Sequence, residues 1–276
     1  MNTRARFLAA VAASVIVAAG CSGAATTAPA SASPAAASAA ASASPSASGA
    51  AASGLSVTSF DASFSAMAQL KSVTTAGKGL VGVILPDVTT SARYTSYDLP
   101  YLTKAFTEAG YATTDFKIDN AQGTTTTQLA IAQADITAGA KVLLVDPLDG
   151  PTGKQVQAAA AAAGVTMISY DRATFQGTST YYVSFDNVQV GKLIGTGFMQ
   201  CVTDWGVTSP KVFTVDGGQD TDPNAVSFAQ GYNQSIWNDK TTPLTAGKTN
   251  SAGYTLVAEK IAPGWDNAAG QTVFQQ

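Results

Sequence analysis

Short apolar runs alternate with longer amphipathic segments from residue 80 onward. Apolar runs at 80–85, 111–118, 141–145, 165–169 and 181–185 predict five strands. Helices are predicted up to about residue 109, over 123–138 and over 152–163, each followed by a glycine. Alternating strands and helices predict a parallel, doubly wound α/β sheet, because right-handed crossovers place helices on both faces.

The alternation continues less regularly toward the last residue. The pattern predicts helices at 188–202, 224–238 and 265–274, and strands at 211–215 and within 248–257. Three glycines in the 188–202 helix, Gly191, Gly195 and Gly197, are expected to permit close packing. This pattern starts a second sheet and does not complete it. The predicted fold is therefore a two-lobe α/β clamp with an incomplete second lobe.

The predicted boundaries follow from these patterns. A short amphipathic helix is expected in residues 55–78, where Phe60, Phe64, Met67 and Leu70 have helical spacing. The first lobe is expected to cover 79–187 and the partial second lobe 188–276.

The first 54 residues predict an export signal and a linker. Arg4 and Arg6 precede a short apolar run, and the segment ending at Cys21 resembles a bacterial lipobox. We expect a signal peptide at 1–20, lipidation of Cys21 and a disordered Ala/Ser/Pro linker through 54. The chain would then be exported and anchored to the outer face of the cytoplasmic membrane. The alternative is an ordinary signal peptide with a chance cysteine.

Composition excludes several classes of site. The chain has no histidine and a formal net charge of −3, which argues against His-dependent catalysis, most zinc sites and a nucleic-acid partner. No dinucleotide, phosphate or calcium loop matches its required spacing. We therefore predict no catalytic residue, no metal and no cofactor. Cys201, within an apolar helical pattern, is expected to be a buried small residue.

Polar side chains follow four of the predicted strands. These candidates are Arg93, Tyr94, Asp171, Arg172, Asp186, Asn187, Asp222 and Asn224. Each set also has an ordinary explanation as a solvated arginine, a surface ion pair or a helix cap. Open α/β sheets bind ligands beyond the carboxyl ends of their strands, so the repeated placement favours one binding site.

The chemistry of these side chains suits a neutral, polyhydroxylated ligand. Carboxylates accept hydrogen bonds, guanidinium groups donate them, and an amide does both, as sugar hydroxyls require. Tyr94 and Tyr170 are candidates for an aromatic wall against the apolar face of a ring.

Four segments together resemble the periplasmic sugar-binding proteins of ABC importers, in particular their D-xylose-binding branch. These are SYDR at 169–172, SFDN at 184–187 followed by Val190-Gly191, DNAQGTTTTQ at 119–128, and GGQDTDPNA at 217–225. The resemblance covers about residues 79–276. It implies capture of a xylose-like monosaccharide by lobe closure, and delivery to an ABC permease with a cytoplasmic ATPase.

The resemblance also implies roles for single residues. Arg93, Asp171, Arg172 and Asn224 match sugar contacts, Tyr94 stands where an aromatic stacks on the ring, and Asp222 precedes Asn224 in the same loop. Asp186 and Asn187 match a position that serves as hinge or ligand, and Ala229 is expected to loosen the pocket. Two alternatives remain: a sugar-sensing receptor that signals to a membrane sensor, and a truncated product that does not bind.

Overall fold

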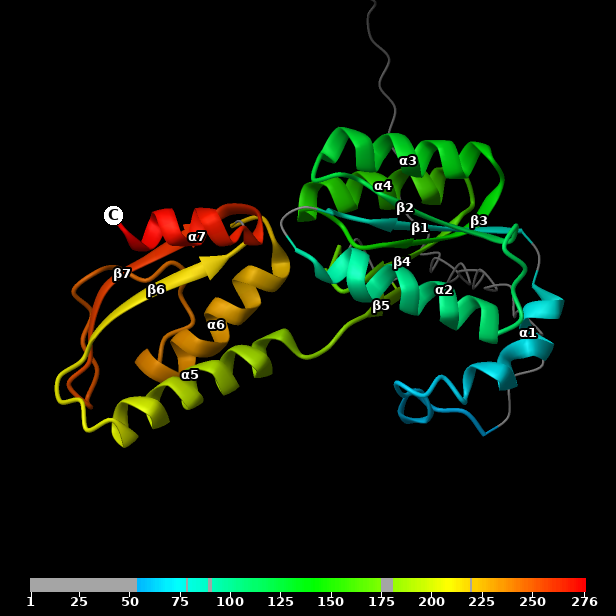
Figure 1. Cartoon of the computed structure of the whole chain (residues 1–276). Helices are drawn as coiled ribbons and strands as arrows, with labels where there is room; N and C mark the ends of the chain where they lie inside the picture. The colour runs from blue at the N-terminus through cyan, green and yellow to red at the C-terminus, as the bar shows by residue number, and fades with distance from the viewer. Residues whose placement is uncertain (1–53, 78, 89–90, 175–180, 219) are drawn as a thin grey trace, which may run out of the picture. The chain divides into compact units, whose positions relative to one another are not determined.

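In the computed structural model, five parallel strands form the larger of the two sheets found among the described residues (Figure 1). The structure describes residues 54–77, 79–88, 91–174, 181–218 and 220–276, so the predicted signal peptide, Cys21 and nearly all of the linker lie outside it. The strands are β1 (Leu80–Leu85), β2 (Phe116–Asn120), β3 (Ala140–Val145), β4 (Thr166–Tyr170) and β5 (Tyr181–Val183). Their order is β2-β1-β3-β4-β5, which confirms the doubly wound prediction. The strand order reverses between β1 and β3, because β2 was added on one side of β1 and β3 on the other.

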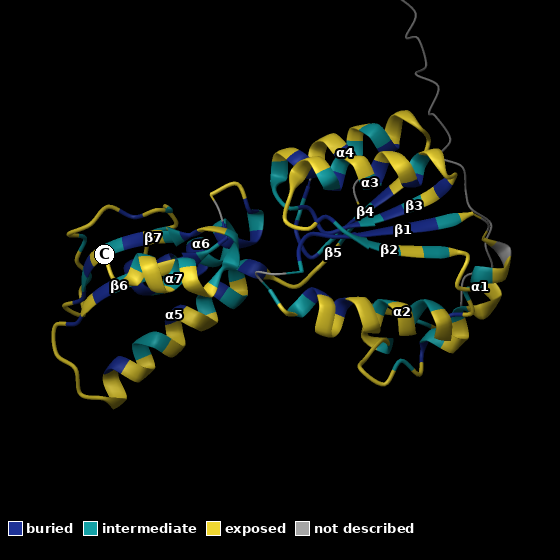
Figure 2. Ribbon diagram, turned by 45° about the horizontal axis from the view of Figure 1, so that its top comes forward, coloured by how far each residue is buried: buried dark blue, intermediate teal, exposed yellow. Residues whose placement is uncertain are grey.

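Helices cover both faces of this sheet (Figures 1 and 2). Helix α2 (Leu99–Glu108), preceded by the π-helical turn η3 (Tyr94–Asp98), lies on one face. Helices α3 (Thr125–Thr137) and α4 (Gly150–Ala162) lie on the other. Adjacent residues of β1 belong to different cores, since Ile84 packs toward α3 and α4 while Val83 packs toward α2. Both are fully buried, as expected for a strand covered on two sides.

One strand and one helix predicted in the first part of the chain differ from the structure, and polar turns explain both differences. The predicted strand at 111–118 begins only at Phe116, because Asp115 closes a turn by accepting a hydrogen bond from the backbone N–H of Ala112 at 3.0 Å. The predicted helix around Phe60–Leu70 is replaced by the short turns η1 (Val57–Ser59) and η2 (Met67–Leu70), and helix α1 (Lys71–Ala76) follows. Between these turns, Asp61 accepts a hydrogen bond from the Ser63 backbone at 2.9 Å.

The smaller sheet has two parallel strands, β6 (Lys211–Gly217) and β7 (Thr255–Ala262). Three helices and a 3₁₀ turn accompany it: α5 (Asn187–Asp204), α6 (Pro223–Trp237), η4 (Pro263–Trp265) and α7 (Asn267–Phe274). The strand predicted at 248–257 begins only at Thr255. Asn250 causes the delay by accepting hydrogen bonds from the backbones of Ala252 and Tyr254 at 3.0 and 2.9 Å, which forms a turn.

Helices α5 and α6 pack closely because glycines remove the side chains between them. A Cβ added at Gly191 would lie 2.2 Å from the carbonyl oxygen of Phe228, and one at Gly231 would lie 2.2 Å from that of Val188. Gly195 is similarly crowded, which confirms two of the three glycines expected to permit close packing. Gly197 is the exception, since nothing lies within 4 Å of its added Cβ.

Cys201 is exposed, so its predicted burial is wrong. The buried face of α5 carries Gly191, Gly195 and Val202, and Cys201 lies beside that face. Among the helices that the structure describes, none has the length and apolar character needed to cross a bilayer.

Two of the three glycines of α5, Gly191 and Gly197, give a matched test of helix packing. Gly191→Ala is expected to lower the free energy of unfolding by about 1–3 kcal/mol, because the new methyl group collides with the α6 backbone. Gly197→Ala should raise it by about 0.5–1 kcal/mol, because alanine loses less backbone entropy in a helix. Urea unfolding measures both, and equal effects would contradict the packing described here.

Candidate functional site

Polar and aromatic side chains surround a cavity of about 490 Å³ beyond the carboxyl ends of the large sheet's strands. Its lining includes Asp87, Arg93, Tyr94, Asp171, Arg172, Phe185, Asp222, Asn224, Phe228 and Trp265. Six of the eight candidates from the sequence therefore lie around one cavity. They come from the segments after β1, β4 and β6, as the strand-end argument predicted.

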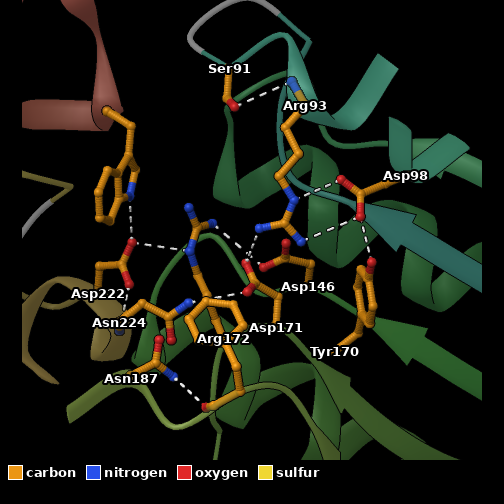
Figure 3. Close-up of polar contacts among 12 residues, drawn as sticks. Ser91, Arg93, Asp98, Asp146, Tyr170, Asp171, Arg172, Asn187, Asp222 and Asn224 are labelled. Atoms are coloured by element: carbon orange, nitrogen blue, oxygen red, sulfur yellow. Dashed lines mark hydrogen bonds and ion pairs between the residues drawn. The ribbon is translucent and has the colours of Figure 1, made fainter. Parts of the chain in front are cut away.

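Arg93 is held between two carboxylates (Figure 3). Its Nε lies 2.8 Å from Oδ2 of Asp98, and its Nη1 lies 3.0 Å from Oδ2 of Asp171. The hydroxyl of Tyr170 donates a hydrogen bond to the same Asp98 carboxylate. Burial opposes the charge of Arg93, but the hydrogen bond to Asp98 and the charge of Asp171 outweigh it and raise the pKa of the guanidinium.

Arg172 occupies a similar position and is more deeply buried, with 7% of its side chain exposed. Its Nε lies 3.0 Å from Oδ2 of Asp222, and its Nη1 lies 3.6 Å from Oδ1 of Asp146. The same Nη1 donates a hydrogen bond of 3.2 Å to the carbonyl of Pro147. Burial acts to lower the pKa of Arg172, and the nearby carboxylates, Asp146 above all, raise it overall. Both arginines are therefore fixed cations, each between two acids.

Asp222 is at once a helix cap and an ion-pair partner. As N-cap of α6, its Oδ1 accepts hydrogen bonds from the backbones of Asn224 and Ala225 at 2.8 and 3.4 Å. Its Oδ2 faces Arg172 and also accepts a 2.8 Å hydrogen bond from the indole Nε1 of Trp265. The cap that the sequence offered as an alternative explanation is thus real, and it accompanies the contact with Arg172.

Asn224 links the start of α6 to the loop after β4. Its Nδ2 donates a hydrogen bond to Oδ1 of Asp171 at 3.3 Å. Its own Oδ1 is buried and has no hydrogen-bond partner among the described residues, so it can accept a hydrogen bond from another molecule. Asp171 itself adopts a left-handed backbone with φ of 65°, which is uncommon for a non-glycine residue.

The aromatic surface of the cavity differs from the prediction. Tyr94 is buried and lines the cavity as expected, with the Arg93 guanidinium carbon 5.3 Å from its ring centroid. Burial, and next the charge of Asp146, raise the pKa of its hydroxyl. Tyr170, the second candidate, packs into the core of the large sheet and does not line the cavity.

Three other rings complete the aromatic surface. Phe185 and Phe228 are stacked with centroids 6.1 Å apart, and Trp265 meets Phe228 edge-on at 6.0 Å. Ala229 does not loosen the cavity as expected, because it is buried in the core beneath α6 and its neighbour Phe228 lines the cavity instead.

Asp186 and Asn187 do not line this cavity. Asp186 is exposed and caps α5 by accepting a 2.9 Å hydrogen bond from the backbone of Gln189. Asn187 is buried and donates hydrogen bonds to the Tyr182 hydroxyl and the Phe185 carbonyl at 3.2 and 3.4 Å. The cap explanation therefore holds for Asp186, and a hinge role for either residue stays a prediction.

Sequence reasoning missed Asp98, Asp146 and the three aromatic rings of Phe185, Phe228 and Trp265. Asp146 carried a usable signal, because it directly follows the apolar strand β3. Asp98 ends the turn before α2, and Trp265 lies 43 residues after its partner Asp222, so neither had a local pattern to identify it. Among the described residues, no group of acidic or cysteine side chains is arranged to hold a metal ion.

A family comparison agrees with this architecture. The profile of the periplasmic binding protein domain matches residues 81–276. The chain belongs to this family.

Individual relatives are similar to parts of the chain. The Multiple sugar-binding periplasmic receptor ChvE of Rhizobium radiobacter is 33% identical over 161 residues, covering 56% of this chain and 43% of the receptor. The D-xylose-binding periplasmic protein of Escherichia coli is 28% identical over 114 residues, covering 41% of this chain and 33% of that protein. The chain thus spans less than half the length of these curated relatives.

A solved structure gives a similar result. The carbohydrate transporter solute binding protein from Chloroflexus aurantiacus, in complex with D-glucose, has 27% sequence identity and a TM-score of 0.53. The match covers 65% of this chain and 48% of that one. The likeness includes the α/β fold with its parallel sheet.

Two aspartates that cap helices, the buried Asp222 and the exposed Asp186, separate the energy of the Arg172–Asp222 pair from that of an ordinary helix cap. Asp222→Ala is expected to lower the free energy of unfolding by about 3–5 kcal/mol, because it leaves buried Arg172 without one of its two carboxylates. Asp186→Ala removes an exposed cap and should cost only about 1 kcal/mol. Chemical unfolding measures both, and similar losses would show that the Arg172–Asp222 pair adds little to the cap.

Proposed function

We propose that this protein binds a neutral monosaccharide in the cavity and releases it unchanged, as the solute-binding component of an ABC sugar importer. The observation that carries the proposal is one cavity lined by two arginines paired with acids, by hydrogen-bonding acids and an amide, and by several aromatic rings. The proposed ligand contacts are Arg93, Tyr94, Asp171, Arg172, Asp222 and Asn224, to which we add Phe185, Phe228 and Trp265.

Each class of side chain matches a feature of a sugar. Guanidinium groups held by acids present their remaining N–H donors in fixed directions, and the carboxylates and Asn224 Oδ1 supply acceptors. The Phe185–Phe228 stack and Trp265 offer flat apolar surfaces for the C–H face of a pyranose or furanose ring. Binding needs no chemical step, so none is proposed.

The excess of carboxylates over guanidinium groups favours a neutral ligand over an anionic one. Arg93 and Arg172 face four carboxylates, those of Asp98, Asp146, Asp171 and Asp222. A uronate or sugar phosphate would bring a further negative charge to a site whose cations are already neutralised. Such like-charge contacts disfavour binding.

The named relatives support a sugar and do not single out xylose. One is named for multiple sugars, another for D-xylose, and the solved Chloroflexus structure holds D-glucose. We therefore widen the proposed ligand from a xylose-like sugar to neutral pentoses and hexoses. The proposed partner is an ABC permease with its ATPase. Because the Rhizobium relative is named a receptor, a sensory role is the second candidate, and neighbouring genes for a sensor kinase would favour it.

A sugar panel tests the proposal. Purified protein is heated with D-xylose, L-arabinose, D-ribose, D-glucose, D-galactose or, as the anionic arm, D-galacturonate. A ligand at a hundred times its Kd should stabilise the fold by about 2.7 kcal/mol. We expect a shift in Tm with at least one neutral sugar and none with galacturonate.

Two variants show whether the shift arises in this cavity. Asp171→Asn should abolish it, because Asp171 orders both Arg93 and Asn224. Asp239→Asn is the control, since it breaks a 2.7 Å ion pair with Lys248 that does not line the cavity, and it should leave the shift intact. No shift with any neutral sugar, or one that survives Asp171→Asn, would overturn the proposal.

We also propose export and lipid anchoring through Cys21, with residues 21–54 as a tether. In a bacterial host, the protein should incorporate labelled palmitate and sediment with membranes. Cys21→Ala should abolish both, whereas Cys201→Ala should retain both because Cys201 lies on an exposed face of α5. Label that persists in Cys21→Ala would refute the anchor.

A further inference from the structure

Asp146 is a buried acid with an unusual environment. It directly follows β3, and its side chain is fully buried and does not line the cavity. Neither of its carboxylate oxygens has a hydrogen-bond partner among the described residues. The guanidinium of Arg172 is its ion-pair partner, with 3.6 Å between Nη1 and Oδ1. Burying a carboxylate without hydrogen bonds destabilises the fold, so the attraction between Asp146 and Arg172 has to offset the lost hydration.

The backbone of Asp146 is fixed from two directions. Its N–H donates a 3.0 Å hydrogen bond to the carbonyl of Ile84 in β1. Its carbonyl accepts a 2.9 Å hydrogen bond from Nε2 of Gln128, a fully buried side chain of α3. The carboxylate is therefore attached to a rigid point at the β1–β3 switch of the sheet.

We infer that Asp146 is a positioning residue that holds the Arg172 guanidinium in the cavity wall, between itself and Asp222. This inference rests on the proposed function, because Arg172 is one of the proposed sugar contacts. Asp146 attracts the Nη1 side of the guanidinium, and Asp222 binds its Nε side. Without Asp146, the guanidinium keeps the carboxylate of Asp222 on its Nε side and loses the carboxylate on its Nη1 side.

The chain offers a matched control for this inference. Asp135, in α3, is also almost fully buried, has an oxygen without a hydrogen-bond partner, and pairs with a cation, Lys117 Nζ, at 3.3 Å. It does not line the cavity or contact Arg172. Asp135→Asn and Asp146→Asn therefore make the same chemical change at two almost fully buried aspartates, of which only Asp146 pairs with a buried cation.

The first measurement is the Kd for each neutral sugar of the panel. Asp146→Asn should weaken binding on the order of tenfold, the lower end of the effect known for residues that orient metal-ligating side chains, because Asp146 orients Arg172 in the same indirect way. Asp135→Asn should leave Kd unchanged. If sugar binds the wild type and Asp146→Asn with equal Kd, the inference is wrong.

The pH profile separates positioning from general destabilisation. Burial raises the pKa of Asp146, and the charge of Arg172 opposes that rise. The charges of Asp171, Arg93 and Asp222 also shift the pKa of Asp146, so only the difference between the pH profiles of the variants is diagnostic. As pH falls, protonation of Asp146 should weaken sugar binding in the wild type and in Asp135→Asn. In Asp146→Asn this part of the pH dependence should be absent, and an unchanged profile would count against the inference.

A measurement without sugar keeps the two proposals separate. If Asp146 acts on Arg172, the effects of Asp146→Asn and Arg172→Lys on the free energy of unfolding should be non-additive. The pair Asp135→Asn and Arg172→Lys should be additive. If no sugar binds the wild type, the proposed function fails while this cycle still decides whether Asp146 holds Arg172. Additivity in the first pair would overturn the inference.

Discussion

Burying a guanidinium group requires compensating negative charge, and this requirement organises the site. Arg172 has 7% of its side chain exposed and lies between Asp146 and Asp222. Asp146 directly follows strand β3 of the large sheet, and Asp222 caps helix α6 beside the small sheet. The electrostatic need of one side chain thus connects the carboxyl edge of one sheet to the start of a helix on the other.

Because Arg172 needs a carboxylate, the helix-capping Asp222 has two roles. An aspartate at a helix N-terminus ordinarily satisfies free backbone N–H groups, as Asp186 does at α5. Asp222 makes that contact with one oxygen and uses the other for Arg172 and Trp265. Trp265 is thereby drawn to the cavity, where it meets Phe228. A single cap therefore helps arrange both the charged and the aromatic parts of the cavity.

Close packing of helix α6 against helix α5 supports this arrangement. Phe228 and Asn224 lie on α6, whose contact with α5 depends on Gly191 and Gly231. Any side chain at those glycines would meet backbone atoms that cannot move far, so the helix carrying these two cavity residues would shift. The positions of polar Asn224 and aromatic Phe228 in the cavity therefore depend on glycines, which have no side chain.

The sequence alone determined the strand–helix alternation, the parallel sheet and the strand ends at which polar residues gather. These features follow from local periodicity and from a topology that brings carboxyl ends of parallel strands to one edge. Even Asp146 was within reach of that argument. Tertiary structure decided the rest. Tyr170 reaches Asp98 across 72 residues and Trp265 reaches Asp222 across 43, and such contacts leave no periodic trace. Which aromatic faces the cavity, and which aspartate is only a cap, depends on burial, which long-range packing creates.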